Sequence, residues 1–318
     1  MVGMMKLLSA LILLLLAAGP AVAQDSANQP SQSGNDVTTT PERIAVRVDL
    51  VNVLFTATDK KNRLVLDLTK DDFHVFEDEK PQNIRFFSRE SNLPLRIGIL
   101  IDTSNSVRDR LRFEQEAAVD FLTATLRPGK DLAYIMGFDV EAQVVQDYTE
   151  DMEKLSKAVR SLRAGGGTGL YDAIYLACRE KMLFFPPPEP YLRRVMIVIG
   201  DGLDNQSIHT REEALAMAQR AEVTIFAIST NRTGAPGRGD KVLKRLAEET
   251  GGRPFFPFSV RDLAGNFQEI ARELRSQYSL AYVSSNAAHD GTFRQITIDP
   301  MEKNVRVRAK AGYFAPSQ

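Results

Sequence analysis

The sequence predicts an α/β protein, with a doubly wound, mostly parallel sheet that carries one antiparallel edge strand. This unit is inserted in a small β-sandwich-like domain built from the N- and C-terminal flanks. Two observations predict the arrangement. Between residues 93 and 277, short apolar stretches alternate with helix-length amphipathic ones, which is typical of a parallel sheet covered by helices. On both sides, in residues 43–92 and 278–315, apolar residues recur with a period of two, which indicates strands.

The N-terminal flank begins with an alternation from Ile44 to Leu50 that changes phase at Val51, and further strands fit 64–68, 73–77 and 84–87. In the C-terminal flank, strands are expected at 278–282, 293–298 and 305–309. Each flank has only about 40 to 50 residues, too few to bury a sufficient core alone. Because the ends of a domain are often close together, we expect the flanks to pair around the inserted unit.

The middle region carries the parallel sheet and its helices. Its expected strands are 96–101, 132–138, 142–148, 194–199, 224–228 and 254–257. Its expected helices are 107–126, 151–162, 170–183, 211–221, 241–250 and 260–277. The segment Phe138–Glu141 is too short for a crossover helix, so the strands on either side of it must form an antiparallel hairpin.

The N-terminus has the features of a secretory signal. Lys6 precedes an apolar run from Leu7 to Ala18, and Ala21-Val22-Ala23 supplies the small residues before a cleavage site after Ala23. Residues 24–42 are polar and fit a disordered linker. We therefore expect a secreted or periplasmic protein without a lipid-anchor cysteine near the cleavage site, and without a transmembrane helix once the signal is removed.

Bulk composition limits the partners and the chemistry. The net charge of −1 disfavours nucleic acid or an anionic membrane as the main partner. The single cysteine, Cys178, rules out an internal disulfide and lies in an apolar helical pattern that indicates burial. His74, His209 and His289 are scattered, so they do not indicate an acid–base or zinc site. We predict no catalytic residues.

Oxygen-bearing side chains follow the strands where a parallel sheet binds ligands, at the carboxyl ends. Asp102, Ser104 and Ser106 follow the first strand of the middle region. Asp201 follows the strand 194–199, and Thr168 stands in the glycine-rich run 165–169. Oxygen ligands alone suit a hard cation, Mg²⁺ or else Mn²⁺ or Ca²⁺. Neutral hydroxyls leave the charge of such a cation under-compensated, so the site would accept a carboxylate from a partner.

These motifs, Asp102-Thr103-Ser104-Asn105-Ser106 with Thr168 and Asp201-Gly202, resemble the metal-ion-dependent adhesion site of von Willebrand factor type A domains. The resemblance covers about 95–277 and implies a six-stranded sheet with one antiparallel strand. It implies that Ser104 and Ser106 bind the metal directly, that Thr168 does so in the ligand-competent state, and that Asp102 and Asp201 act directly or through water. Asn105, Gly167, Gly202 and Asp204 are expected at the ligand-binding rim.

Two positions depart from the family pattern, because Asn105 stands where glycine is commonest and Gly200 where threonine or serine is usual. The flanking Leu68-Thr69, the run Asp72–Asp78 and the closing Gly312-Tyr313-Phe314 resemble a bacterial exported subfamily of these domains.

The sequence thus predicts an exported binding protein whose protein or glycoprotein partner presents an Asp or Glu carboxylate to the cation. Two alternatives remain open at this stage. One is an envelope scaffold protein in which the cation only stabilises the loops, and the other is a metal-dependent hydrolase. A tripeptide that some integrins recognise, Arg238-Gly239-Asp240, is better explained by Asp240 capping the following helix.

Overall fold

The computed structural model describes residues 50–90, 92–183, 192–231, 237–257 and 260–317. The predicted signal peptide and the predicted linker lie outside the described residues. So does the predicted alternation from Ile44, except for its last residue, Leu50.

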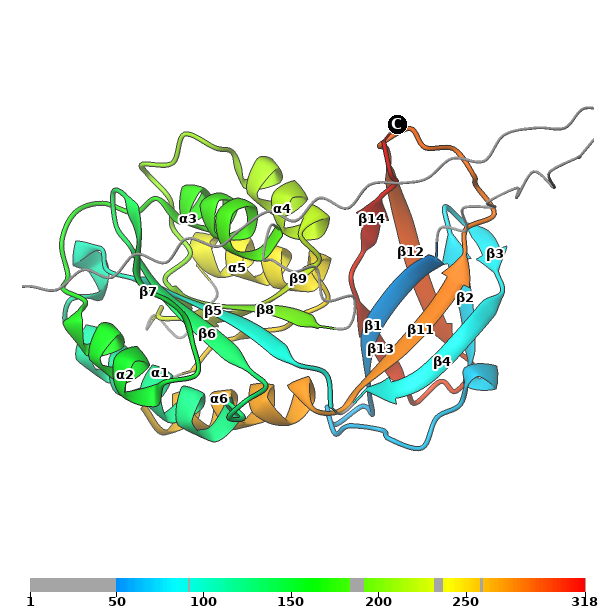
Figure 1. The fold of residues 1–318 in the computed structure, drawn as a ribbon, viewed down its shortest axis with the longest axis horizontal. Coiled ribbons are helices and arrows are strands. Elements are labelled where there is room, and N and C mark those ends of the chain that lie inside the picture. Colours follow the sequence, from blue (N-terminus) through cyan, green and yellow to red (C-terminus); the bar gives the residue numbers. More distant parts are fainter. Residues whose placement is uncertain (1–49, 91, 184–191, 232–236, 258–259, 318) are drawn as a thin grey trace, which may run out of the picture. The chain divides into compact units, whose positions relative to one another are not determined.

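The central sheet has six strands in the order β10-β9-β8-β5-β6-β7 (Figure 1). The strands are β5 (Leu95–Asp102), β6 (Leu132–Phe138), β7 (Ala142–Thr149), β8 (Arg193–Gly200), β9 (Val223–Ser229) and β10 (Pro254–Phe255). All neighbours pair in parallel except β6 and β7, which form the predicted antiparallel hairpin. The predicted fold class is confirmed, and β5 lies inside the sheet between β8 and β6.

Helices cover both faces of this sheet, as Figure 1 shows. They are α1 (Leu111–Thr125), α2 (Met152–Ser161), α3 (Leu170–Leu176), α4 (Arg211–Arg220), α5 (Arg238–Glu249) and α6 (Val260–Leu274). Helices α1, α2 and α6 contribute to one apolar core, and α3, α4 and α5 contribute to the other. Strand β5 serves both, because Ile97, Ile99 and Ile101 pack into the first core while Leu100 packs into the second. A strand covered on both faces explains its unbroken apolar sequence.

Helix boundaries differ from the prediction at several places. The last predicted helix, 260–277, ends at Leu274, because Gln277 already belongs to a strand. The first helix begins at Leu111, because residues 105–107 form a separate 3₁₀ turn. The predicted helix 170–183 widens into a π-helix from Ala177 to Leu183. Helix α5 begins at Arg238, three residues early, because the Asp240 carboxylate accepts the Gly237 N–H at 2.6 Å. This confirms the capping role of Asp240, which is buried and therefore not displayed for recognition.

The two flanks form two four-stranded sheets, and each sheet combines strands from both flanks. One has the order β13-β1-β11-β4, from β1 (Leu50–Thr58), β4 (Ile84–Glu90), β11 (Gln277–Val283) and β13 (Arg306–Ala309). The other has the order β14-β12-β2-β3, from β2 (Phe73–Glu77), β3 (Lys80–Gln82), β12 (Phe293–Pro300) and β14 (Gly312–Phe314). They share one apolar core, so the predicted pairing of the flanks is found.

The predicted strand 64–68 is wrong. Apart from an isolated bridge between Leu64 and Thr58, this segment is irregular. Its backbone is held by the Tyr278 hydroxyl, which donates to the Val65 carbonyl and accepts the Leu68 N–H, each at 3.1 Å. Strand β3 was not predicted, because Lys80-Pro81-Gln82 contains no alternating apolar residue.

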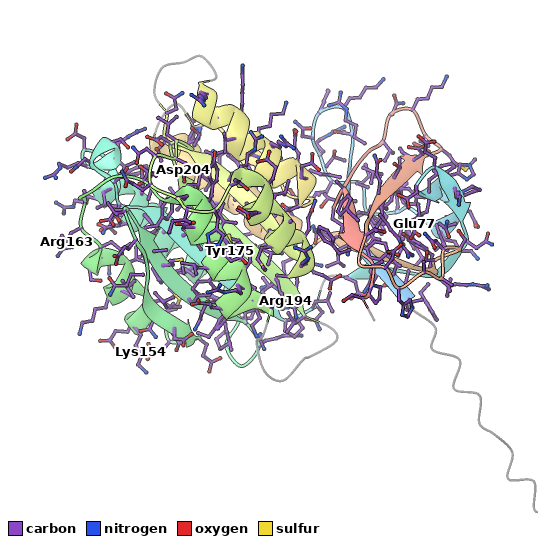
Figure 2. The ribbon with its side chains drawn as sticks, turned by 90° about the horizontal axis from the view of Figure 1, so that it is seen from above. Glu77, Lys154, Arg163, Tyr175, Arg194 and Asp204 are labelled. Carbon is purple, nitrogen blue, oxygen red and sulfur yellow. The ribbon has the colours of Figure 1, made fainter. Side chains whose placement is uncertain are left out.

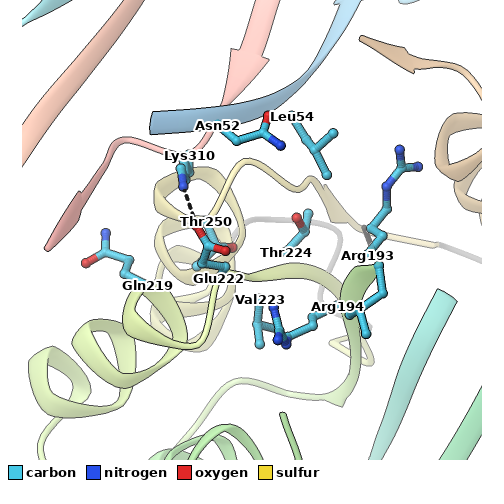
Figure 3. A pocket seen from close by; sticks show the side chains of 11 residues that line it. Asn52, Leu54, Arg193, Arg194, Gln219, Glu222, Val223, Thr224, Thr250 and Lys310 are labelled. Atoms are coloured by element: carbon cyan, nitrogen blue, oxygen red, sulfur yellow. Dashed lines mark hydrogen bonds and ion pairs between the residues drawn. The ribbon is translucent and has the colours of Figure 1, made fainter. Parts of the chain in front are cut away.

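A pocket of about 230 Å³ lies between the β flanks and the central unit (Figure 3). Its main ion pair joins Lys310 to Glu222 at 3.0 Å, and the charge of Lys310 lowers the pKa of Glu222. This ion pair connects the end of β13 to the turn after α4, so we assign the pocket a structural role.

Two further expectations concern burial and membranes. Cys178 is buried, as predicted, and burial raises the pKa of its thiol, so it behaves as a small apolar side chain. Within the described residues, no helix combines the length and the apolar character needed to span a bilayer.

Candidate functional site

The last residue of β5, Asp102, brings a carboxylate to the carboxyl end of the buried strand. It is 1 % exposed. Its Oδ1 accepts the Ser104 N–H at 2.8 Å, whereas Oδ2 has no hydrogen-bond partner within the described residues. Burial, with a further contribution from the charge of Asp201, raises the pKa of Asp102 to about 6. A charged group in this position is costly unless something compensates its second oxygen.

A chain of hydroxyls connects this loop to the loop after β8. The Ser104 and Ser106 Oγ atoms are 2.9 Å apart, and the Ser106 hydroxyl donates to Asp201 Oδ2 at 2.8 Å. The other carboxylate oxygen of Asp201 accepts the Leu203 N–H at 2.9 Å. Four of the five predicted metal ligands are therefore within one continuous hydrogen-bonded group, although they come from sequence positions almost a hundred residues apart.

The third loop places Thr168 beside this group through backbone contacts. The Gly165 N–H donates to the Thr103 carbonyl at 2.7 Å, and the Asn105 N–H donates to the Gly166 carbonyl at 3.3 Å. Thr168 itself is buried, and its N–H donates to Asn205 Oδ1 at 3.0 Å. The Thr168 carbonyl in turn accepts the Asn205 N–H at 3.0 Å.

Asn205 is thus a positioning residue that the sequence did not reveal. Its only signal was an amide side chain shortly after Asp201-Gly202, and such residues are also common in loops that bind nothing.

The four predicted rim residues divide into two pairs. Asn105 is exposed, and its Oδ1 accepts a hydrogen bond from Arg108 at 2.7 Å. This bond gives Asn105 a physical role, since it ties the turn to the segment before α1. Gly167 packs against the loop after β8, where a Cβ would lie 2.7 Å from Gln206 Cγ. Both residues border the site.

Gly202 and Asp204, the other two, face inward. Gly202 is buried with φ at 75°, and a Cβ there would meet the Gly239 carbonyl oxygen. Asp204, labelled in Figure 2, accepts the Tyr171 N–H at 3.1 Å and the Ser207 hydroxyl at 2.6 Å. Asp204 therefore caps the start of α3, and Gly202 allows α5 to approach closely.

The departure at Gly200 has a steric explanation. A Cβ at this position would lie 2.9 Å from Asp102 Cβ and 3.0 Å from Asp102 Oδ2. In this chain the space of a side chain at position 200 is occupied by the Asp102 carboxylate.

The donor set fits a hard divalent cation. It offers two carboxylates and three hydroxyls, with one buried carboxylate oxygen left unpaired. No cluster of three or more His, Cys, Asp or Glu side chains suited to a metal occurs in the part of the chain that the structure describes. A site of mixed carboxylates and hydroxyls does not need such a cluster.

No histidine belongs to the hydrogen-bonded group that joins Asp102 to Asp201. The contacts of His209 are with α3, because its Nδ1 lies 2.6 Å from Asp172 Oδ1 and its ring stacks on Tyr175 with 3.8 Å between the ring centroids. Asp204 is the carboxylate of the predicted site that is not among the metal ligands, and it already caps α3.

Comparisons with known proteins agree with the fold. The family model described as von Willebrand factor type A domain matches residues 97–273. No curated protein matches the chain. Among solved structures, the von Willebrand factor type A protein from Catenulispora acidiphila is 13% identical, with a TM-score of 0.50, and the match covers 85% of this chain and 74% of that one.

Two further solved structures are similar to parts of this chain at low identity. BatB from Bacteroides thetaiotaomicron is 19% identical, with a TM-score of 0.47, over 57% of this chain and 100% of that chain. Proximal thread matrix protein 1 from the mussel byssus, solved with a zinc-occupied MIDAS motif, is 17% identical, with a TM-score of 0.48, over 62% of this chain and 49% of that chain. The family model matches more than half of the chain, which therefore belongs to the von Willebrand factor type A domain family.

Proposed function

We propose that this chain is an exported binding protein that captures a partner through a divalent cation. The cation is held by Asp102, Ser104, Ser106, Thr168 and Asp201, and an Asp or Glu carboxylate of the partner completes its coordination. The observation that carries the proposal is the buried carboxylate of Asp102, whose Oδ2 is unpaired beside a chain of hydroxyls. A cation supplies the compensating charge that this oxygen needs, and it leaves a position open for an anionic ligand.

Mg²⁺ is the cation that the donor set favours, with Mn²⁺ and Ca²⁺ as the other candidates. Mg²⁺ prefers one or two carboxylates and retains several waters, which suits two Asp side chains combined with neutral hydroxyls. The residues of this chain orient the site. Asn205 fixes Thr168, Leu203 fixes Asp201, and the Ser104 N–H fixes Asp102.

Binding, rather than catalysis, is the function that these contacts support. A hydrolase that uses a metal needs a base placed to activate water. Asp204, the carboxylate of the predicted site that is not a metal ligand, accepts the Tyr171 N–H and the Ser207 hydroxyl instead. Export, membership of the bacterial exported subfamily, and location in the periplasm or outside the cell are parts of the same proposal, and they rest on the N-terminal sequence and the flank motifs.

Calorimetric titration of the chelator-treated protein with Mg²⁺, Mn²⁺ and Ca²⁺ tests the metal site, with Asp102→Asn as the variant. A thermal melt in each condition reports whether binding stabilises the fold. Pull-down from an envelope extract with Mg²⁺ or with EDTA then tests capture. We expect wild-type protein to bind metal and to retain a partner only when metal is present. Partner capture that survives both EDTA and the substitution would refute the proposal, and stabilisation without capture would favour a scaffold role.

A further inference from the structure

Large apolar side chains are exposed at one edge of the central unit. Among the side chains described between residues 95 and 274, the large exposed hydrophobic ones are Val140, Leu203, Ile208 and Phe256. Each follows the carboxyl end of a parallel strand: Val140 follows β6, Leu203 and Ile208 follow β8, and Phe256 follows β10. This is the sheet edge that carries Asp102 and Asp201. Apolar side chains scattered over a surface need no explanation, but confinement to a functional edge indicates a contact surface.

Three of the four, Val140, Leu203 and Ile208, are in the loops that follow β6 and β8, and we call them the apolar rim. Val140 and Leu203 have contacts beside the candidate ligands, and Ile208 is in the same loop as Leu203. Val140 Cγ2 is 3.0 Å from the position of a Cβ on Gly166, two residues before Thr168. Leu203 donates its N–H to Asp201 Oδ1. Phe256 is excluded from the rim because β10 is the edge strand, separated from β8 by β9.

Ile208 is the clearest member, because its side chain is 90 % exposed although its backbone is firmly held. The Ile208 N–H donates to Asp172 Oδ2 at 3.0 Å, and the neighbouring His209 N–H donates to Asp172 Oδ1 at 2.9 Å. An isoleucine that is anchored in place but buries almost nothing does not serve the core. Because the backbone at Ile208 is already held and a β-branched side chain has few χ1 rotamers, ordering this side chain against a partner costs little entropy.

We propose that the apolar rim contacts the residues on either side of the carboxylate that the partner supplies. The site then recognises a polypeptide in which an Asp or Glu is flanked by apolar side chains. This inference rests on the proposed function, and it names the class of ligand for that site. An acidic glycan is the less suitable ligand, because its hydroxyls would lose water against aliphatic side chains that cannot hydrogen-bond to them.

The experiment compares immobilised probes that differ only beside the carboxylate. Two acetylated and amidated peptides, Gly-Phe-Asp-Leu-Gly and Gly-Ser-Asp-Ser-Gly, each carry one carboxylate, and Gly-Phe-Asn-Leu-Gly carries none. An oligogalacturonate serves as the acidic glycan. Binding is measured by biosensor in Mg²⁺ and in EDTA, with wild type, Leu203→Ser, Ile208→Ser and Met301→Ser. Met301 is a matched control, because it is 60 % exposed in the turn after β12.

We expect wild type in Mg²⁺ to bind the Phe-Asp-Leu peptide about tenfold more tightly than the Ser-Asp-Ser peptide or the glycan. EDTA, or replacement of Asp by Asn in the peptide, should abolish that binding. Leu203→Ser and Ile208→Ser should each weaken it about threefold to tenfold. Because each variant keeps its backbone N–H bond, to Asp201 or to Asp172, the Mg²⁺ affinity measured by calorimetry should not change. Met301→Ser should have no effect.

Equal affinity for the two Asp peptides, tighter binding of the glycan, or rim variants that bind like wild type would overturn the inference. So would a protein that binds Mg²⁺ but neither Asp peptide. In these outcomes the proposed metal site would still stand. A protein that does not bind Mg²⁺ in calorimetry would contradict the proposed function itself, so the two failures are distinguishable.

Discussion

Two buried carboxylates end strands in different sheets, and their surroundings are opposite. Glu77 is the last residue of β2 and is 2 % exposed, and Asp102 is the last residue of β5 and is 1 % exposed. Glu77 (Figure 2) accepts the Tyr282 hydroxyl at 2.8 Å and the Tyr313 hydroxyl at 3.0 Å on Oε2. Its Oε1 accepts the Ser284 hydroxyl and lies 3.6 Å from Arg294. Asp102 has one oxygen unpaired.

The difference separates a structural carboxylate from a functional one. A buried charge with all of its oxygens paired belongs to the architecture, and here Glu77 joins three strands, β2, β11 and β14, in the β flanks. A buried charge with a free oxygen lowers stability by itself, and it persists where a ligand compensates for it. Burial and residue type alone would not have distinguished the two.

The largest effect is expected in the β flanks. Glu77→Ala removes the nearer carboxylate partner of Arg294, which is itself 2 % exposed and has Asp290 as a second partner at 4.0 Å. Breaking a buried pair of this kind costs about 3–5 kcal/mol. Urea unfolding measures the change, with Glu302→Ala, at an exposed turn position, as the control. If both variants unfold at the same urea concentration, the role assigned to Glu77 is wrong.

The matching substitution at Asp102 should abolish the stabilisation by Mg²⁺ and should hardly change the stability of the metal-free protein. In EDTA, Asp102→Asn should unfold within about 1 kcal/mol of wild type, because a neutral amide removes the cost of the buried charge. At a hundredfold excess of Mg²⁺ over its Kd, wild type should gain about 2.7 kcal/mol and the variant nothing. Strong destabilisation in EDTA would place Asp102 in the same class as Glu77.

A smaller effect is expected when the space beside Asp102 is filled. Gly200→Ala puts a methyl group 2.9 Å from Asp102 Cβ, and overpacking of this kind costs about 1–3 kcal/mol. It should also weaken Mg²⁺ binding, because Asp102 must move. Gly265→Ala adds the same methyl group to α6 where no atom lies within 4 Å. Chemical denaturation should show this variant no less stable than wild type, because alanine favours a helix interior over glycine.

Acid should lower the stability of the protein by protonating a third buried carboxylate, Asp131. Burial raises its pKa, but bonds from Arg127, the Leu95 N–H and Arg275 outweigh this and lower it below the ordinary 3.8. The unfolded state therefore binds the proton more readily, so this stabilisation is complete above the ordinary pKa and is lost as the pH falls through the folded value. Unfolding measured from pH 6 to about pH 2 should show Asp131→Asn less sensitive to acid than wild type.

The smallest effect is expected at Asn105, an exposed residue of the predicted ligand-binding rim. Asn105→Ala removes only the bond from Arg108, so stability should fall by no more than about 1 kcal/mol. Calorimetry should give a Mg²⁺ affinity within about twofold of wild type. A tenfold loss would mean that Asn105 supports the metal ligands and not only the turn.

The strands and helices of the middle region were predictable because their signals are local. Strand β5 reads as unbroken apolar sequence because both of its faces are covered, and no other environment suits such a run as well. The prediction of a strand at 64–68 rested on alternating leucines, and that alternation has another cause. Its leucines alternate, but in the structure Val65 and Leu68 pack on the core while Leu66 is 41 % exposed. A loop laid over a core can produce an alternating pattern without any sheet pairing.

The sequence by itself determined the order of strands and helices and the oxygen chemistry of the candidate site, because period and residue type are properties of neighbouring residues. Only the tertiary structure decided which oxygens are satisfied. Asp102 keeps an unpaired oxygen, Glu77 has none, Asp204 caps α3, and Asn205 holds Thr168. Each of these outcomes depends on where a distant loop or strand comes to lie, and that position is set by the packing of the whole sheet.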